Sequence, residues 1–167
     1  MKKLLLFLCA LFFIAGASAQ NEMFKALFMY NFTKDIDWPD SYKQGDFVIG
    51  VLGNSEIIAE LNKIAQKKKV GGQQIKVKKF TAVNDIEKCN ILYLPENKSS
   101  QLSAALEKLT DKPTLIITDK PGLAQEGAGI NYVTVDGGQK FEINRNNIQA
   151  RGLKINSFLL SLGIVVD

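Results

Sequence analysis

The residues that most often carry out chemistry in proteins are scarce in this sequence. There is no histidine among its 167 residues, so the commonest general base and the commonest metal ligand are both missing. The Gly-x-Ser-x-Gly elbow and the Walker phosphate-binding loop are also absent from the sequence. A serine hydrolase of the usual triad type is therefore excluded. The sequence predicts a protein that is not an enzyme and needs no cofactor.

Cysteine chemistry is equally restricted. Of the two cysteines, Cys9 lies in the leader described below, and Cys89 is the one that the mature chain keeps. Cys89 has no histidine to activate it and no second cysteine with which to form an internal disulfide. Because it stands just before the apolar run 91–94, we expect a buried structural thiol first and an intermolecular disulfide second.

Three carboxylates, Asp35, Asp37 and Asp40, have a spacing that resembles a cation-binding loop. The spacing does not fit the EF-hand pattern, and Pro39 interrupts it. We expect a solvated turn and predict no metal site.

Two loops could bind a small ligand. Asn54 and Ser55 follow a predicted strand and precede a predicted helix, and free N–H groups at a helix N-terminus favour an anion. Asp119 and Lys120 follow another strand at its carboxyl end, where open α/β sheets usually bind ligands. Helix capping also explains Asn54 and Ser55, so the loops predict a small-ligand or anion-binding module only as an alternative.

Trp38 is the sole tryptophan, and it stands with Pro39 at the end of an aromatic-rich segment. A tryptophan in this position can be a residue at the rim of the core or a recognition residue. The sequence leaves both interpretations open.

The first 19 residues have the features of a signal peptide. Lys2 and Lys3 precede an apolar stretch over residues 4–15, and Ala17-Ser18-Ala19 offers small residues at the cleavage site. The stretch is shorter than the roughly 20 residues that a membrane span needs. We expect cleavage after Ala19, leaving residues 20–167 as one domain in a bacterial periplasm, with no segment inserted in the membrane.

The positive charge does not indicate a nucleic-acid partner. The formal net charge of +4 falls by two when Lys2 and Lys3 are removed with the leader. The remaining basic residues cluster within residues 63–80. This region contains no arginine and a single phenylalanine, Phe80, whereas nucleic-acid surfaces combine arginine with aromatic residues. This cluster fits a solvated helix end and a sheet edge, and consists of Lys63, Lys67, Lys68, Lys69, Lys76, Lys78 and Lys79.

Most of the mature chain alternates strands with helices. Residues 21–33 predict a helix with apolar residues on two faces, which indicates that it is covered on more than one side. Helices are also predicted over residues 55–66 and from Ser99 or Ser100 onward. Strands are predicted over residues 47–52, 75–80, 89–94 and 114–118.

The last part of the chain predicts a β-hairpin followed by a helix. Residues 130–135 and 140–144 form the arms, and Gly137-Gly138 forms the turn. Asn144 then caps one helix, whose buried stripe consists of Ile148, Gly152, Ile155, Leu159 and Leu162. The fold class is α/β: a three-layer sandwich with a mostly parallel central sheet of about six strands, flanked by helices.

Several segments together are similar to the YfiR family of periplasmic proteins. The most specific are FKALFMYNFTKDIDWP, which ends at Pro39, and the FEIN…GLKINSFLL region from Phe141 to Leu160. The resemblance covers essentially the whole mature chain.

This resemblance implies a non-enzymatic regulator that binds and controls an inner-membrane signalling protein. The partner would be a diguanylate cyclase of the YfiN type or a sensor histidine kinase, and the regulator itself is a possible homodimer. Members of the family can carry two cysteine pairs that respond to oxidation, but Cys89 has no partner here, so that switch does not carry over. The candidate partner- or ligand-binding residues are Trp38, Pro39, Asn54, Ser55, Asp119, Lys120, Glu142 and Asn144.

Overall fold

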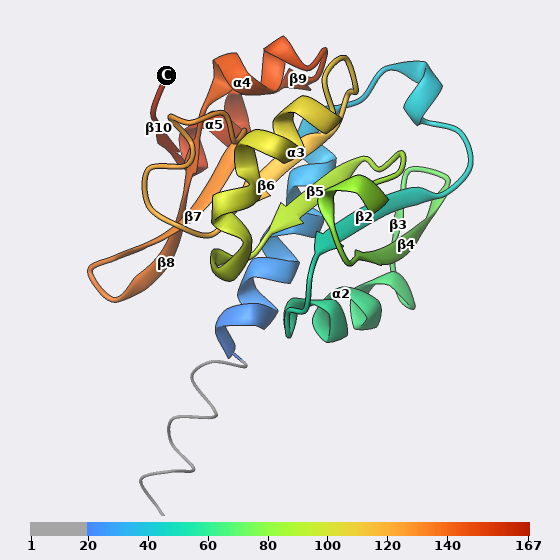
Figure 1. The fold of residues 1–167 in the computed structure, drawn as a ribbon, viewed down its shortest axis with the longest axis horizontal. Coiled ribbons are helices and arrows are strands. Elements are labelled where there is room, and N and C mark those ends of the chain that lie inside the picture. Colours follow the sequence, from blue (N-terminus) through green and yellow to red (C-terminus); the bar gives the residue numbers. More distant parts are fainter. Residues whose placement is uncertain (1–19) are drawn as a thin grey trace, which may run out of the picture.

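The computed structural model describes residues 20–167, so the predicted signal peptide lies outside the described residues. An N-terminal helix over residues 20–35 is followed by a mixed α/β arrangement (Figure 1). The strands are β1 Ile36–Asp37, β2 Phe47–Leu52, β3 Lys69–Val70, β4 Gln73–Phe80, β5 Ile91–Leu94, β6 Leu115–Thr118, β7 Ile130–Val135, β8 Gly138–Ile143, β9 Lys154–Ile155 and β10 Ile164–Val165. The further helices are η1 Asp40–Tyr42, α2 Ile57–Ala65, η2 Val83–Asp85, η3 Glu96–Gln101, α3 Leu102–Lys108, α4 Arg145–Ala150 and α5 Ser157–Leu162.

Eight strands form the main sheet in the order β10-β8-β7-β6-β5-β2-β4-β3. The pairs β4–β2, β2–β5, β5–β6 and β6–β7 are parallel, while β7–β8 and β3–β4 are antiparallel. The mostly parallel α/β prediction is confirmed. The sheet has more strands than the six expected because β3 and β10 are two-residue edge strands, too short to leave a pattern in the sequence.

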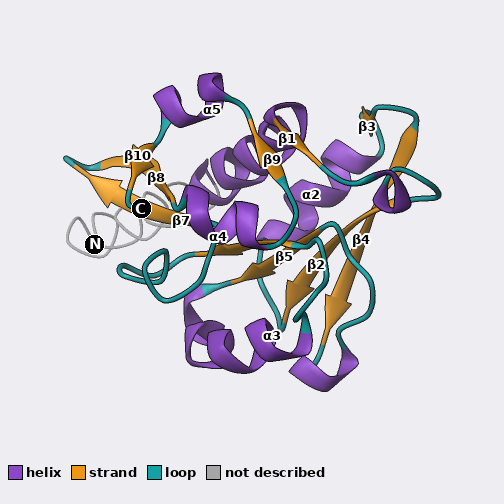
Figure 2. Ribbon diagram, turned by 90° about the horizontal axis from the view of Figure 1, so that it is seen from above, coloured by secondary structure: helices purple, strands orange, loops and turns teal. Residues whose placement is uncertain are grey.

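Helices cover both faces of this sheet, as a parallel sheet requires. The N-terminal helix, α2, α4 and α5 pack on one face, and α3 packs on the other (Figure 2). The central strands therefore send apolar side chains to two cores. In β5, Ile91 and Tyr93 join the first core, while Leu92 and Leu94 join the second.

The N-terminal helix is less covered than predicted. Ala26, Met29 and Phe32 are buried against the sheet. The apolar residues of its first turns are exposed, namely Met23, Phe24 and Leu27. The helix is therefore apolar on a face that nothing in the described part of the chain covers.

The C-terminal hairpin is present, but its turn is one residue earlier than predicted. Val135 pairs with Gly138, so Asp136 and Gly137 form the two-residue turn. Both have positive φ, 53° and 74° respectively, as a type I′ turn requires.

The prediction of a single helix after the hairpin is wrong. The chain forms α4, turns at Gly152, adds β9 to the short strand β1, and starts again as α5. Gly152 has a φ of 70° and nothing within 4 Å of where a Cβ would stand, so it ends a helix and does not lie on a buried stripe. Asn156 caps α5 by accepting a hydrogen bond from Leu159 N, a second cap that the four- and three-residue spacing concealed.

Cys89 is fully buried and unpaired, as the first interpretation predicted. Burial raises the pKa of its thiol to about 12. The thiol is therefore unavailable for an intermolecular disulfide while the protein is folded.

Candidate functional site

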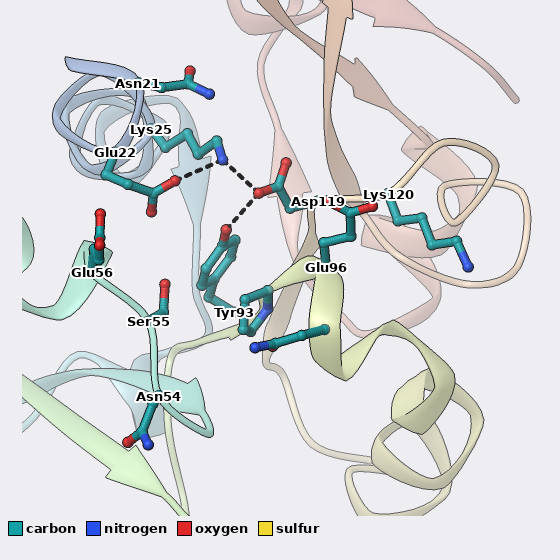
Figure 3. Close-up of a pocket in the computed structure, with 12 residues that line it drawn as sticks. Asn21, Glu22, Lys25, Asn54, Ser55, Glu56, Tyr93, Glu96, Asp119 and Lys120 are labelled. Atoms are coloured by element: carbon teal, nitrogen blue, oxygen red, sulfur yellow. Dashed lines mark hydrogen bonds and ion pairs between the residues drawn. The ribbon is translucent and has the colours of Figure 1, made fainter. Parts of the chain in front are cut away.

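A polar cleft lies where three parallel strands end. The loops after β2, β5 and β6 carry Asn54, Glu96 and Asp119, and the first turns of the N-terminal helix close the opposite side (Figure 3). The volume of the cleft is about 760 Å³, within the range of small-molecule sites. Because the carboxyl ends of parallel strands meet at one edge, loops far apart in the sequence come together here.

Lys25 is the central charge of the cleft. Its side chain is only 6% exposed, and its Nζ donates to Glu22 Oε1 at 2.8 Å and to Asp119 Oδ2 at 2.5 Å. Burial on its own would lower the pKa of Lys25, but the hydrogen bonds and charges of Asp119 and Glu22 outweigh burial and raise it. The ammonium is therefore charged and held between two carboxylates, which ties the N-terminal helix to the end of β6.

Two buried tyrosines complete this arrangement. Tyr93 Oη donates to Asp119 Oδ2 at 3.0 Å, and Tyr132 Oη donates to the backbone carbonyl of Lys25 at 2.7 Å. Burial, reinforced by the charges of Asp119 and Glu22, raises the pKa of both phenols well above the usual value. Both hydroxyls therefore stay protonated and act as donors that fix the carboxylate and the helix.

The loop that carries Asp119 is positioned from the neighbouring strand. Asn131 Oδ1 accepts hydrogen bonds from Thr118 Oγ1 at 2.8 Å and from the backbone N–H of Lys120 at 3.2 Å. Its amide donates to Glu142 Oε2 at 2.9 Å, which orients the asparagine. This network holds the backbone on both sides of Asp119, so the carboxylate faces Lys25.

A second region of interest is apolar. In the part of the chain that the structure describes, every exposed large hydrophobic residue lies either on the N-terminal helix or in the last ten residues. On the helix these are Met23, Phe24 and Leu27, and at the other end Phe158, Leu162, Ile164 and Val165. We call this set the apolar surface.

A groove is lined by side chains from both segments that carry the apolar surface, the N-terminal helix and α5, and Leu162 belongs to both the groove and the apolar surface. The groove has a volume of about 210 Å³ and is lined by Phe28 and Phe32 of the helix, Phe141 of β8, and Leu159 and Leu162 of α5. Polar residues also line it, namely Asn31, Asp35, Gln139 and Lys140. An apolar area with a polar rim is typical of a protein-binding surface.

A family model described as YfiR/HmsC-like matches residues 22–164, nearly all of the described residues.

The chain belongs to the YfiR/HmsC-like family.

No curated protein matches this YfiR/HmsC-like chain at a significant level. Among solved structures, it is similar to the ABC domain in complex with L-Trp from Streptococcus pneumonia, with a TM-score of 0.52 and 16% identity. The match covers 71% of this chain and 55% of that one, so this chain spans about half the length of its structural neighbour. At this identity the similarity concerns the fold alone.

Four of the predicted site residues of this YfiR/HmsC-like chain line the cleft together: Asn54, Ser55, Asp119 and Lys120. Asn54 Oδ1 accepts a hydrogen bond from Lys79 Nζ at 3.1 Å, and Ser55 Oγ accepts a long one, 3.4 Å, from Ile57 N at the start of α2. Asp119 is bonded to Lys25 and Tyr93, while Lys120 is exposed.

The other four do not line the cleft. Trp38 is 4% exposed, donates its indole N–H to the carbonyl of Asn90 at 3.2 Å, and packs edge-on against Phe47. It is a core residue, as in the first of the two interpretations left open, and its role in partner binding stays a prediction. Pro39 is half-buried and precedes η1.

The remaining two make hydrogen bonds within the fold. Glu142 accepts the hydrogen bond from Asn131 described above. Asn144 caps α4 by accepting from Asn147 N at 3.0 Å, and its amide donates to the carbonyl of Ala124 at 3.1 Å. Both act behind the cleft rather than in it.

Glu22, Lys25 and Tyr93 also line the cleft, although they were not predicted from the sequence. Two features of the sequence indicate them. Lys25 is a single basic residue between apolar neighbours in a helix, with Glu22 one turn earlier, and Tyr93 is the polar-tipped residue in the apolar strand β5. A charged or hydroxyl-bearing side chain at a core position needs a partner, which indicates a polar site nearby.

Two further observations concern metals and membranes. Within residues 20–167, no group of three or more acidic or cysteine side chains is placed to hold a metal ion. Asp37 and Asp40 form ion pairs with Lys43, at 2.9 and 3.4 Å, in an exposed turn. None of the helices within residues 20–167 combines the length and the hydrophobicity that a membrane span requires.

Proposed function

We infer that this protein is a non-enzymatic periplasmic regulator that binds the periplasmic region of an inner-membrane signalling protein and controls its output. The partner is a diguanylate cyclase of the YfiN type or a sensor histidine kinase. Membership of the YfiR/HmsC-like family supports the regulatory role, and the signal peptide predicted over residues 1–19 supports export.

The observation that carries this proposal is the position of the apolar surface. Leu27 is 47% exposed and Phe158 is 61% exposed, and the exposed apolar residues are confined to two segments that border one groove. Scattered exposed hydrophobics are ordinary, whereas a gathered set with a polar rim marks an interaction site. Binding that buries these residues gains about 25 cal/mol for each Å² of apolar area removed from water.

Several contacts hold this surface in shape before a partner arrives. Phe28 packs against Phe141 with ring centroids 5.5 Å apart, and Phe32 packs edge-on against the same ring at 4.9 Å. Asn156 donates to Asp35 Oδ1 at 2.7 Å, which links the end of the helix to the start of α5. A preformed surface loses less conformational entropy on binding.

Site-specific cross-linking in living cells tests the proposal. A photoreactive residue at Leu27 or Phe158 is expected to capture an inner-membrane protein that has a periplasmic domain and a cytoplasmic cyclase or kinase domain. The same residue at Ala104, exposed on α3 across the sheet, is the control and is expected to capture nothing comparable.

Two other outcomes would change the proposal. Capture of a second copy of this chain at Leu27 and Phe158, with no membrane protein, would make the apolar surface a homodimer interface. Equal capture from Ala104 and Leu27 would remove the apolar surface from the mechanism. Deletion of the gene should also change the output of the captured partner, and an unchanged output would contradict the regulatory role.

A further inference from the structure

We propose that the ion pair between Lys25 and Asp119 is a latch that positions the partner-binding residues of the N-terminal helix. The inference rests on the function proposed above and deepens it, because it names the contact that orients the apolar surface at Met23, Phe24 and Leu27. Lys25 and Asp119 are then positioning residues, which act on the partner through the helix and do not touch it.

The first two turns of this helix have few other contacts with the sheet. Within residues 20–27, the buried side chains are those of Lys25 and Ala26, and Ala26 offers a single methyl group. In the described part of the chain, two hydrogen bonds join these turns to other elements. They run from Lys25 Nζ to Asp119 Oδ2 at 2.5 Å and from Tyr132 Oη to the carbonyl of Lys25 at 2.7 Å. Both involve Lys25, so one residue determines how these turns lie on the sheet.

The later turns of the same helix are held in a different way. Met29 and Phe32 are buried in the first core, and the Phe32 ring packs against Phe141 at 4.9 Å and against Tyr132 at 6.3 Å. The burial of these large apolar side chains keeps the later turns docked without the ion pair. Loss of the ion pair is therefore expected to release residues 20–27 and to leave the rest of the helix in place.

Helix geometry connects the buried lysine with the exposed apolar residues. Because an α-helix turns by about 100° per residue, Met23 and Leu27 each point about 160° away from Lys25. With Lys25 fixed toward the sheet, both residues must face solvent, and they are 46% and 47% exposed. Released turns would present the same side chains in many orientations, and a partner would have to order them on binding, which lowers the affinity.

The carboxylate that receives the lysine is itself held in place. Tyr93 donates to Asp119 (Figure 3), and Asn131 holds the backbone on both sides of that residue, as described above. Glu22, the other partner of Lys25, lies on the same helix, so that bond moves with the helix and does not tie it to the sheet. Asp119 is therefore the fixed end of the latch.

Three variants separate the latch from other contacts. Asp119→Ala breaks it without leaving an unpaired lysine, because Lys25 keeps its ion pair with Glu22. Tyr132→Phe removes the second hydrogen bond to the helix and leaves the ring in the core. Glu87→Ala is the matched control, since it removes an exposed ion pair with Lys78 on β4, near the other edge of the sheet.

Amide hydrogen exchange of the mature protein tests the latch without any partner. In Asp119→Ala, protection of the amides of residues 24–27 should fall at least about 10-fold, while residues 29–33 keep their protection. Tyr132→Phe should give the same pattern with a smaller fall, because a neutral hydrogen bond is weaker than a charge-assisted one. Glu87→Ala should change neither segment.

Two exchange results would overturn the proposal. One is equal protection of residues 24–27 in the wild type and in Asp119→Ala. The other is an equal loss along the whole helix, which would show a general loss of stability and no local release. If Asp119→Ala does not fold, Tyr132→Phe decides in its place.

Cross-linking measures the consequence for binding. With the photoreactive residue at Leu27, Asp119→Ala should capture the membrane partner about fivefold less than the wild type, because fewer molecules have the helix in the binding orientation. Capture from Phe158 should fall less, since the latch does not hold α5. Leu102→Ala, which destabilises the second core, should leave capture from Leu27 unchanged and so excludes an effect of stability alone.

The two measurements keep the latch distinct from the function it rests on. Reduced protection of residues 24–27 with unchanged capture from Leu27 would overturn the positioning role. No capture by the wild type from either Leu27 or Phe158 would contradict the proposed function, and the binding role of the latch would fall with it. In that case hydrogen exchange still decides whether the ion pair holds the helix.

Discussion

The polar cleft and the apolar surface share the N-terminal helix. They differ in whether their side chains find partners within the chain. In the cleft, Lys25 and Asp119 are paired within the chain, and Tyr93 donates a second hydrogen bond to Asp119. On the apolar surface, Leu27 and Phe24 have no covering element among the described residues. Residues of the first region are therefore expected to contribute to stability, and residues of the second region to association.

The largest expected effect on stability comes from Trp38, a core residue that follows the N-terminal helix. Trp38→Ala should lower the free energy of unfolding by about 3–5 kcal/mol, because it removes a buried aromatic side chain and leaves Phe47 without its edge-on partner. Urea unfolding measures the loss, and Trp38→Phe is the milder control. A normal unfolding midpoint together with lost partner capture would return Trp38 to the binding surface.

Lys25→Met should cost about 2–4 kcal/mol, because it leaves the Glu22 and Asp119 carboxylates without the cation between them. A double-mutant cycle with Asp119→Asn measures the coupling, and the double variant should regain part of the loss. Additive losses would show that the two groups do not interact.

The same pair predicts a pH dependence. The pKa of Lys25 is raised by folding above its ordinary value of 10.5, so its stabilising effect is fully present below that pH and is lost as the pH rises through the folded value. The stability difference between the wild type and Lys25→Met should therefore be constant through neutral pH and shrink above about 10.5. Unfolding midpoints measured from pH 7 to 11 check the sign.

Substitutions of Gly152 should lower the free energy of unfolding by a smaller amount, and the size of the new side chain should make little difference. Gly152→Ala and Gly152→Leu should each cost about 1–2 kcal/mol, because both side chains are strained at a φ of 70°. The two costs should be equal, since no atom lies within 4 Å of the Cβ position. Gly152→Asn should cost less, because asparagine tolerates this backbone conformation. A much larger loss for leucine than for alanine would show that the position is packed.

The smallest effects on stability are expected on the apolar surface. Leu27→Ser and Phe158→Ser should each change the free energy of unfolding by less than about 0.5 kcal/mol. Partner capture, measured by cross-linking, should fall strongly in both variants. A large loss of stability would mean that these side chains are part of the core and would weaken the contrast between the two regions.

Much of the cleft could be predicted because parallel strands fix where their loops meet. Asn54 and Asp119 follow recognisable strands, so their proximity follows from the fold class. Lys25 could not be predicted in the same way, because its partner Asp119 is 94 residues away and the pairing depends on where the helix packs. Local periodicity contains no information on such a contact.

The C-terminal segment was mispredicted for a local reason. The apolar spacing through Ile148, Gly152 and Leu159 fits one helix, but a glycine in a left-handed conformation ends it, and Asn156 starts another. The periodicity places Gly152 on the buried stripe of a helix. Its ability to adopt a positive φ instead determines its role, because it ends the helix there.

The short pairing of β1 with β9 has a consequence for biosynthesis. It joins residues 36–37 to residues 154–155, and the groove is likewise lined by the N-terminal helix and α5, from the two ends of the described residues, together with β8. A polypeptide whose synthesis has not reached residue 157 has its first helix but not α5, and it cannot yet form the groove. Only a chain that includes α5 can present the whole groove.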